Sequence, residues 1–439
     1  MRRIAFLAAA LLGSLAAQAQ NGPWSLPDCI NYALEHNLSV QQSALAVEQR
    51  EVELNSAQNR RLPSLSASAS ENLSFGRGLT ADNTYSNSNT TSTSFSLGGE
   101  IPIFQGFDIT NGIKLGELNL AAATADLEKA RDDIRVAVAQ AYVQILYNQE
   151  LLRVARQQAE HDEELLEQIR ERLQAGKVSQ AEVAAQQATL AQSRQSEIQA
   201  EGNLNISLLD LTQLLELPSP EGFAIVTPEV GDPSQVLLMR PEAIYDEAVE
   251  VKPNVEAAKL NVDYAELAIA RAKGAYLPSI SLSGGLGTNF YTNSKFASDP
   301  FGKQLKNNFS QYIGLSMNVP IFTRFNTRNN VRNAELSYKG QQIQLENVKK
   351  SLYKEIQQAY YNAVTAQARY AGSREAAESA RQHYELTEEK YKVGKAGVAD
   401  YNDARNNWLR AESEHIQARF QCLYQTKLLD FYRGKELSF

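Results

Sequence analysis

The segment SFSLGGEIPIF at residues 94–104 alternates between apolar and small polar side chains. Because successive side chains of a strand point to opposite faces of a sheet, the alternation separates two sets. The apolar set is Phe95, Leu97, Ile101 and Ile103, and the polar set is Ser94, Ser96, Gly98 and Glu100. A run of about 10 to 12 such residues has the length of a tilted membrane strand. A soluble hairpin with one buried face shows the same alternation, so the pattern alone leaves both structures open.

The second half of the chain repeats this pattern in a longer internal duplication. RLPSLSASAS (61–70) corresponds to YLPSISLSGG (276–285), EIPIFQGFDITN (100–111) to NVPIFTRFNTRN (318–329), QAGKVSQAEV (174–183) to KVGKAGVADY (392–401), and SLLDL (207–211) to KLLDF (427–431). Four correspondences in the same order indicate a duplicated unit. We predict a first repeat at 20–217, a Pro-rich linker at 218–240 and a second repeat at 241–439.

Each repeat is predicted to begin with a helix and a pair of strands. The first helix spans 28–59, with Asp28 as its candidate N-cap and Pro63 just beyond its end. The strand hairpins are placed at 64–104 and 277–322. In the second hairpin the apolar row is Ile313, Leu315, Met317, Val319 and Ile321. The segments between the paired strands, 71–91 and 288–308, are rich in Asn, Ser, Thr and Gly and are predicted to be long loops.

The rest of each repeat is predicted to be helical. No proline occurs from Ile103 to Leu217, and no glycine from Glu117 to Ala175. About 60 residues of uninterrupted helix would reach roughly 90 Å. Apolar residues follow three- and four-residue steps, which is typical of a coiled coil. A plain coiled-coil rod would fit either long helix alone, but it would not explain the strand pair in each repeat.

The N-terminus and the composition restrict the location of the protein. Residues 1–19 have Arg2 and Arg3, an apolar stretch and a small-x-small cleavage site, so they are predicted to be a secretory signal peptide. After it, no apolar run approaches the ~20 residues of a membrane helix. The formal charge of −8 argues against nucleic acid as a partner. For Cys29 and Cys422 we expect two buried thiols rather than a disulfide.

The sequence contains no motif that indicates an enzyme. His36, His161, His383 and His415 lack the spacing of metal ligands, and each is expected to be a solvated helix residue. Runs of acidic residues such as 160–167 are expected to be solvated helix faces. There is no phosphate-binding loop and no nucleophile motif, so we expect no cofactor, no metal and no catalytic activity.

Taken together, the motifs resemble those of the TolC-like outer-membrane efflux protein family. They are LPS…S before the first strand of each repeat (62–66 and 277–281), (I/V)P(I/L)F after the strand pair (101–104 and 319–322), glycine turns about 72 residues later, and Arg240-Pro241-Glu242 at the start of the second repeat. Each motif alone is weak, but their order and spacing are specific. The resemblance covers nearly the whole chain after the predicted signal peptide.

The resemblance implies a mainly α-helical fold with membrane strands. Each of three chains would give four strands to a shared 12-stranded outer-membrane barrel, and the helices would form a hollow coiled-coil barrel in the periplasm of a Gram-negative bacterium. The function implied is passive conduction, in efflux or type I secretion, from an inner-membrane pump and a periplasmic adaptor to the exterior. The alternative is a structural protein that spans the periplasm without a conduit.

The resemblance also implies functional residues near the two glycine turns. Asp400 and Asp403 match positions where family members carry aspartates around the periplasmic entrance, although acids at a helix N-terminus are also favoured by the helix dipole alone. A family arginine that latches the closed entrance is replaced by Ala396 in this chain. Candidate latch residues are therefore Glu171, Glu182, Tyr391 and Lys395, with Lys177 as a second possible source of charge. Gly176, Lys177, Gly394 and Lys395 are expected to dock an adaptor, the alternative being turns without a partner.

Overall fold

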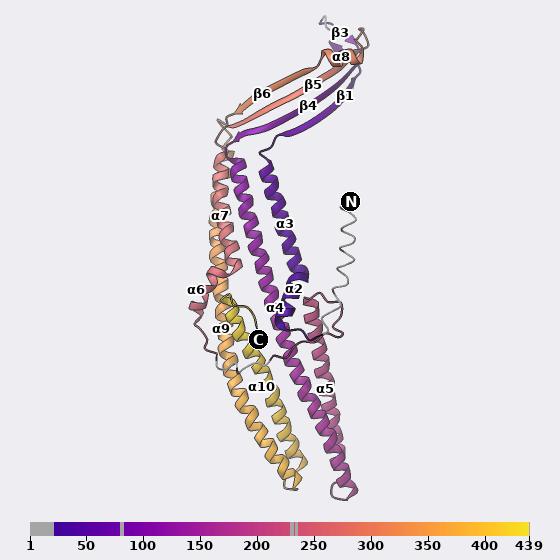
Figure 1. The fold of residues 1–439 in the computed structure, drawn as a ribbon, viewed down its shortest axis with the longest axis vertical. Coiled ribbons are helices and arrows are strands. Elements are labelled where there is room, and N and C mark those ends of the chain that lie inside the picture. Colours follow the sequence, from indigo (N-terminus) through magenta and orange to yellow (C-terminus); the bar gives the residue numbers. More distant parts are fainter. Residues whose placement is uncertain (1–21, 80–82, 229–231, 233–235, 439) are drawn as a thin grey trace. The chain divides into compact units, whose positions relative to one another are not determined.

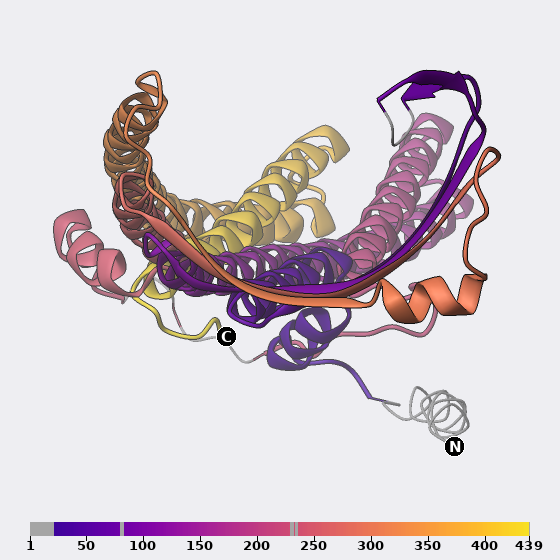
Figure 2. The ribbon, with the colours of Figure 1, turned by 90° about the horizontal axis from the view of Figure 1, so that it is seen from above.

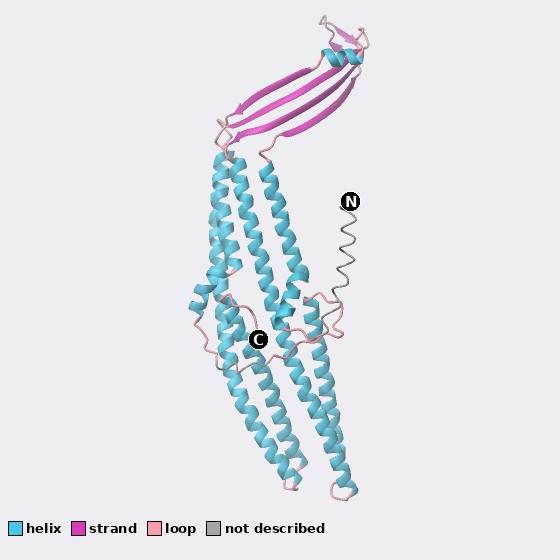
Figure 3. Ribbon diagram, in the orientation of Figure 1, coloured by secondary structure: helices cyan, strands magenta, loops and turns pink. Residues whose placement is uncertain are grey.

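The computed structural model describes residues 22–79, 83–228, 232 and 236–438. The predicted signal peptide at 1–19 and parts of the predicted linker lie outside the described residues. The chain divides into two compact units. Met1–Leu45, Thr124–Glu256 and Glu346–Phe439 form the first, and Ala46–Ala123 and Ala257–Leu345 form the second. The first unit contains helices, and the second contains the sheet and the helix segments next to it (Figure 3).

The helices of the two repeats have the same lengths in the same order (Figure 1). The first repeat has α2 (Leu26–His36), α3 (Leu38–Asn59), α4 (Asp108–Gln174) and α5 (Gln180–Leu214). The second has α6 (Pro241–Val251), α7 (Pro253–Gly274), α9 (Asn326–Lys392) and α10 (Val398–Tyr432). In each repeat these helices contain 11, 22, 67 and 35 residues.

The predicted single helix at 28–59 is wrong in two respects. It begins earlier, because Ser25 is the N-cap: its hydroxyl accepts the Asp28 N–H at 3.3 Å, and the Asp28 carboxylate accepts the Ser25 N–H at 3.1 Å. It also breaks at Asn37, whose backbone is extended. The Asn37 side chain accepts the Ser39 N–H at 3.0 Å and donates to the Leu214 carbonyl at 3.0 Å. The side chain thus supplies local hydrogen bonds that compete with a continuous helix.

A four-stranded antiparallel sheet is the central feature of the second unit. Its strands are β1 (Ser64–Ser74), β4 (Thr90–Gln105), β5 (Ser279–Asn293) and β6 (Ser310–Asn318), in the order β1-β4-β5-β6. Figure 2 shows that the sheet is curved. The order joins the hairpins of the two repeats through β4 and β5, so that β1 and β6 are left as the two edges.

The strand register confirms the predicted separation of apolar and polar faces. Ala67, Leu97, Leu286 and Gln311 form one row across the sheet, and Ser66, Gly98, Gly285 and Tyr312 form the next row on the opposite face. On the polar face, hydroxyl pairs join Ser68 to Ser96 at 2.7 Å and Ser281 to Ser316 at 2.8 Å. On the other face Leu97, Ile313 and Leu315 are 40%, 80% and 71% exposed. One face of this sheet is therefore apolar and open, and the other is lined mainly by serine and glycine.

Two details of the predicted hairpins differ in the structure. β6 ends at Asn318, so Val319 and Ile321 lie outside the strand. Pro320, two residues past the strand end, has no N–H to donate to a sheet. The predicted loops also contain short elements. The first holds the strand pair β2 (Arg77–Leu79) and β3 (Tyr85–Asn87), and the second holds helix α8 (Phe301–Asn307). The Thr288 hydroxyl of β5 donates to the Leu305 carbonyl of α8 at 2.6 Å.

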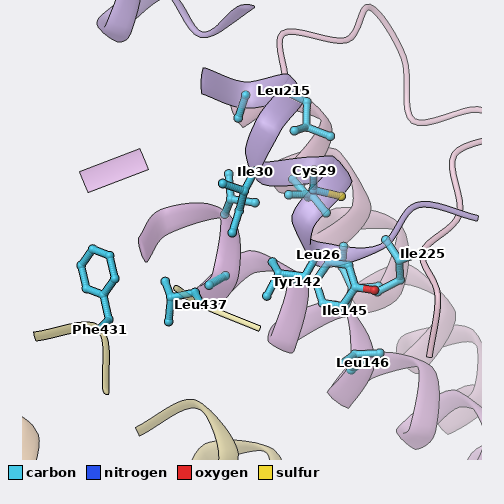
Figure 4. Close-up of a cluster of buried hydrophobic side chains, with 14 residues drawn as sticks. Leu26, Cys29, Ile30, Tyr142, Ile145, Leu146, Leu215, Ile225, Phe431 and Leu437 are labelled. Atoms are coloured by element: carbon cyan, nitrogen blue, oxygen red, sulfur yellow. The ribbon is translucent and has the colours of Figure 1, made fainter. Parts of the chain in front are cut away.

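The largest hydrophobic cluster of the first unit gathers residues from several helices and from the C-terminal segment (Figure 4). It includes Leu26 and Cys29 of α2, Tyr142 and Ile145 of α4, and Leu215. Burial raises the pKa of the Cys29 thiol to about 12. Cys422 is buried in a different cluster, with Ala366, Tyr370 and Ala418. The prediction of two buried thiols without a disulfide is confirmed.

None of the described helices combines the length and the apolar character that crossing a membrane requires.

Candidate functional site

Two helical hairpins of the first unit end in glycine turns of the same geometry. Gly176, between α4 and α5, has φ +70°, and Gly394, between α9 and α10, has φ +74°. Glycine suits this left-handed conformation because it has no Cβ. The Lys177 N–H donates to the Arg172 carbonyl and the Lys395 N–H to the Lys390 carbonyl, both at 2.8 Å. All four of these predicted tip residues are exposed, so both turns present backbone and a lysine to solvent.

Glu182 and Asp400 have equivalent roles just past the two turns. α10 begins 218 residues after α5, so the two acids occupy the same position in the repeats. The Glu182 carboxylate accepts the Ser179 N–H at 3.2 Å, and the Asp400 carboxylate accepts the Gly397 N–H at 3.2 Å. Each acid therefore caps its helix. Asp403 lies one turn further along α10 and is exposed.

A cluster of apolar and aromatic residues, the tip cluster, packs the two hairpins together. Its buried members are Leu165, Leu166, Ile169, Val183, Leu190, Tyr384, Tyr391 and Tyr401. The Tyr391 and Tyr401 rings stack with centroids 5.0 Å apart, and Tyr384 stacks on Trp408 at 5.1 Å. Ala396 packs against this cluster. The position expected to carry a latching arginine is thus part of an apolar contact.

The latch candidates are not brought together as one group. Tyr391 is buried, its ring lies 5.9 Å from the Arg172 guanidinium, and its hydroxyl has no hydrogen-bond partner among the described residues. Glu182 caps its own helix. Glu171 and Lys395 are exposed and form no ion pair within the described part of the chain. Burial raises the pKa of the Tyr391 phenol, with Arg172 acting in the opposite direction.

His161 of α4 is not the solvated helix residue that the sequence predicts. Its Nε2 lies 2.8 Å from the Tyr401 hydroxyl of α10 and 3.3 Å from the Tyr384 hydroxyl of α9. The two hydroxyls are themselves 3.1 Å apart. Burial, followed by the hydrogen bond with Tyr384, raises the pKa of Tyr401 far above its ordinary value. These three polar groups join one hairpin to the other.

Next to His161, Asp162 of α4 forms a buried ion pair with Arg405 of α10. The two residues are 0% and 2% exposed, and Arg405 Nη1 donates to Asp162 Oδ1. The carboxylate also accepts hydrogen bonds from Gln158 at 2.9 Å, from Gln186 at 3.4 Å and from Ser193. The expectation that 160–167 is a solvated helix face is therefore wrong for Asp162. A buried charge needs such partners because it has lost its water.

The ion pair has no counterpart elsewhere in the repeat. The residues 218 positions away from Asp162 and Arg405 are Ala380 and Gln187. The aromatic residues differ in the same way, since Tyr391 and Tyr401 correspond to Leu173 and Val183. Sequence reasoning missed Asp162 and Arg405, although a position-by-position comparison of the repeats would have shown that each gains a charge its equivalent lacks.

The region around the ion pair also contains a groove. This groove, of about 660 Å³ between α4, α5 and α10, is lined by amide, hydroxyl and aliphatic side chains, together with Arg405 and Arg410. Within the described ranges, no group of three or more His, Cys, Asp or Glu side chains could hold a metal ion.

Comparisons with known proteins agree on one protein family. The model of the family described as "Outer membrane efflux protein" matches residues 29–216 and 244–434. Outer membrane protein TolC of Escherichia coli (strain K12) is 26% identical over 362 residues, which are 79% of this chain and 71% of TolC.

Solved structures share the fold over nearly the full chain. The Campylobacter jejuni CmeC outer membrane channel has a TM-score of 0.75 at 21% identity, covering 96% of this chain and 87% of CmeC. The outer membrane protein VceC of Vibrio cholerae has a TM-score of 0.75 at 18% identity, covering 93% of this chain and 96% of VceC.

Proposed function

Because the chain belongs to the outer membrane efflux protein family, we propose that it is the outer-membrane channel of a tripartite efflux or type I secretion system. In this role it passively conducts substrates that an inner-membrane pump and a periplasmic adaptor deliver, and releases them outside the cell. The protein lies in the outer membrane, with its helical hairpins in the periplasm. It performs no catalysis in this role.

The observation that carries the proposal is the sheet with one apolar face, one hydroxyl-lined face and two open edges. Lipid offers no partner to the N–H and C=O groups of an open strand edge, so a sheet in a membrane must close. Four strands are too few to close a barrel. Three copies joined edge to edge would give 12 strands, with the apolar face toward lipid and the hydroxyl face toward a water-filled lumen.

The glycine turns of the two helical hairpins support a docking role. Gly176 and Gly394 let each hairpin reverse sharply and leave the turn backbone exposed, so another helix can approach closely. Lys177 and Lys395 add equivalent positive charges to the two turns. In this proposal the adaptor docks its helical hairpin on these four residues, and three copies of the protein present six such turns.

The closed state of the entrance is held by packing and by a buried charge. Asp400 and Asp403 would form carboxylate rings at the periplasmic aperture, where like charges repel. The tip cluster and the Asp162–Arg405 pair hold α9 and α10 against α4 and α5 within one chain. They take the place of the latch expected at Ala396. Opening would then require this contact to rearrange.

The proposal is tested by recording single channels from purified protein in planar lipid bilayers. Stepwise conductance that persists without any added pump or adaptor is expected, because the conduit is passive. A protein that inserts into the bilayer but never conducts, even after the Asp162–Arg405 contact is removed by mutation, would instead be a structural component that spans the periplasm.

A further inference from the structure

The polar face of the sheet carries a single charged side chain per chain. Within residues 64–74, 90–105, 279–293 and 310–318, the positions in register on this face are occupied by Ser, Thr, Asn, Gln, Gly, Pro and Tyr, with Glu100 as the exception. The other strand carboxylate, Glu71, lies in the alternate row, with Ala67 and Ala69, on the apolar side.

The surroundings of Glu100 leave its carboxylate uncompensated. It pairs across the sheet with Ser64 of β1 and Ser283 of β5. Gly98 precedes it on the same face, and Gly285 lies diagonally across. The Tyr312 ring covers Gly285, because a Cβ there would be 2.7 Å from Tyr312 Cε1. Glu100 is exposed and forms no ion pair within the described residues.

Resting on the channel function proposed above, we propose that Glu100 sets the ion selectivity of the barrel lumen. In three copies the carboxylates form one ring in an otherwise neutral wall of hydroxyl groups and glycine backbone. A ring of carboxylates in a pore attracts cations and repels anions. Since no basic side chain shares the face, nothing in the described strands offsets this field.

The field of such a ring depends strongly on salt. The screening length is roughly 30 Å at about 0.01 M salt and roughly 3 Å at about 1 M. Preference for cations should therefore be clear in dilute salt and nearly absent in concentrated salt. Glu100 lies on the sheet, whereas Asp400 and Asp403 lie on α10, so the two sets of charges can be separated by mutation.

The experiment measures the reversal potential of single channels under a KCl gradient. The background is Asp400→Asn with Asp403→Asn, so that tip charges do not mask the lumen. Glu100→Gln is expected to move the reversal potential toward zero in dilute salt, and Glu100→Lys to change its sign. The matched control is Glu71→Gln, which removes the same charge from the opposite face of the same sheet and should leave the reversal potential unchanged.

Two results would overturn the inference. Glu100→Gln channels that keep the cation preference of the background would show that the charge resides elsewhere. An equal shift in Glu71→Gln would show that the overall charge of the sheet, rather than the ring on its polar face, is responsible. Failure of every variant and of the unmodified protein to conduct would instead contradict the channel function itself.

Discussion

Asp162 of α4 and Arg405 of α10 form an ion pair that both helical hairpins shield from solvent, with exposures of 0% and 2%. Three further side chains donate hydrogen bonds to the carboxylate. Removal of one partner from a buried pair leaves an uncompensated charge and typically costs about 3–5 kcal/mol. Loss of either partner alone should therefore weaken the packing of the two hairpins against each other.

Arg405→Gln should loosen the hairpins, because Asp162 would remain buried without its cation. We expect a clearly lower midpoint of thermal unfolding and a channel that spends more time open in planar bilayers. The control is Arg410→Gln on the same helix, since Arg410 is exposed and, among the described residues, donates a hydrogen bond to Asn407 three residues away.

Replacement of both Asp162 and Arg405 distinguishes the effect of the buried charges on stability from the effect of side-chain packing. Asp162→Leu with Arg405→Met should recover most of the lost thermal stability, because apolar side chains of similar volume remove the need for hydration. If Arg405→Gln unfolds at the same temperature as Arg410→Gln, the buried pair does not hold the hairpins.

His415 should make the stability of the α9–α10 hairpin depend on pH. Its ring stacks on Tyr370 at 5.2 Å, and burial lowers its pKa, with Arg419 and Arg374 adding to the effect and Glu412 and Asp232 opposing it. The folded state therefore favours the neutral ring. The contribution of neutral His415 to the stability of the fold is fully present above the pKa of the unfolded state, about 6.5. It is lost as the pH falls toward the lower pKa of the folded state.

The measurement is the unfolding midpoint against pH for the unmodified protein and for His415→Phe, which can stack but cannot bind a proton. The variant should lose less stability between about pH 7 and pH 5. His36→Gln, at an exposed site on α2, serves as the control and should follow the unmodified curve. Parallel curves for all three proteins would exclude His415 as a contributor.

Asp400→Asn with Asp403→Asn should reduce cation selectivity and reduce block by polyvalent cations added on the periplasmic side. The side-chain oxygen of Asn at position 400 can still accept the Gly397 N–H, so the change removes charge and keeps this hydrogen bond. Bilayer currents measure both properties. Unchanged selectivity and block would mean that the two aspartates serve only as helix N-terminal acids.

A cysteine at Lys303 of α8 should react with a membrane-impermeant thiol reagent on intact cells. Lys303 is exposed and lies between β5 and β6, at the end of the hairpin that we place outside the cell. Lys395→Cys, in a periplasmic turn, should react only after the outer membrane is permeabilised. The reverse order of labelling would mean that the topology is inverted.

The sequence was sufficient to predict the elements that show a periodic pattern or an internal repeat. Alternation around Phe95 and Leu97 predicts β4 and its two faces, and the absence of Gly and Pro predicts the long helices. Short elements such as α8 have too few residues to show a period. The break at Asn37 depends on a hydrogen bond to Leu214, far away in the sequence.

The candidate site was harder to predict, because burial decides what its polar residues do. His161 and Asp162 lie in the acidic run EHDEELLE (160–167), which is typical of a solvated helix face. Only packing against α10 places Tyr401 on the histidine and Arg405 on the aspartate. Glu182 is expected as a latch candidate and Asp400 as an aperture residue, and the sequence could not show that each carboxylate accepts the N-cap N–H of its own helix.

The shared barrel is tested by the mass of the detergent-extracted protein, measured by native mass spectrometry on a preparation that conducts in bilayers. An assembly of three chains is expected, because a sheet of four strands with two open edges closes in a membrane only with further copies. A conducting preparation that contains only monomers would exclude a barrel shared by three chains.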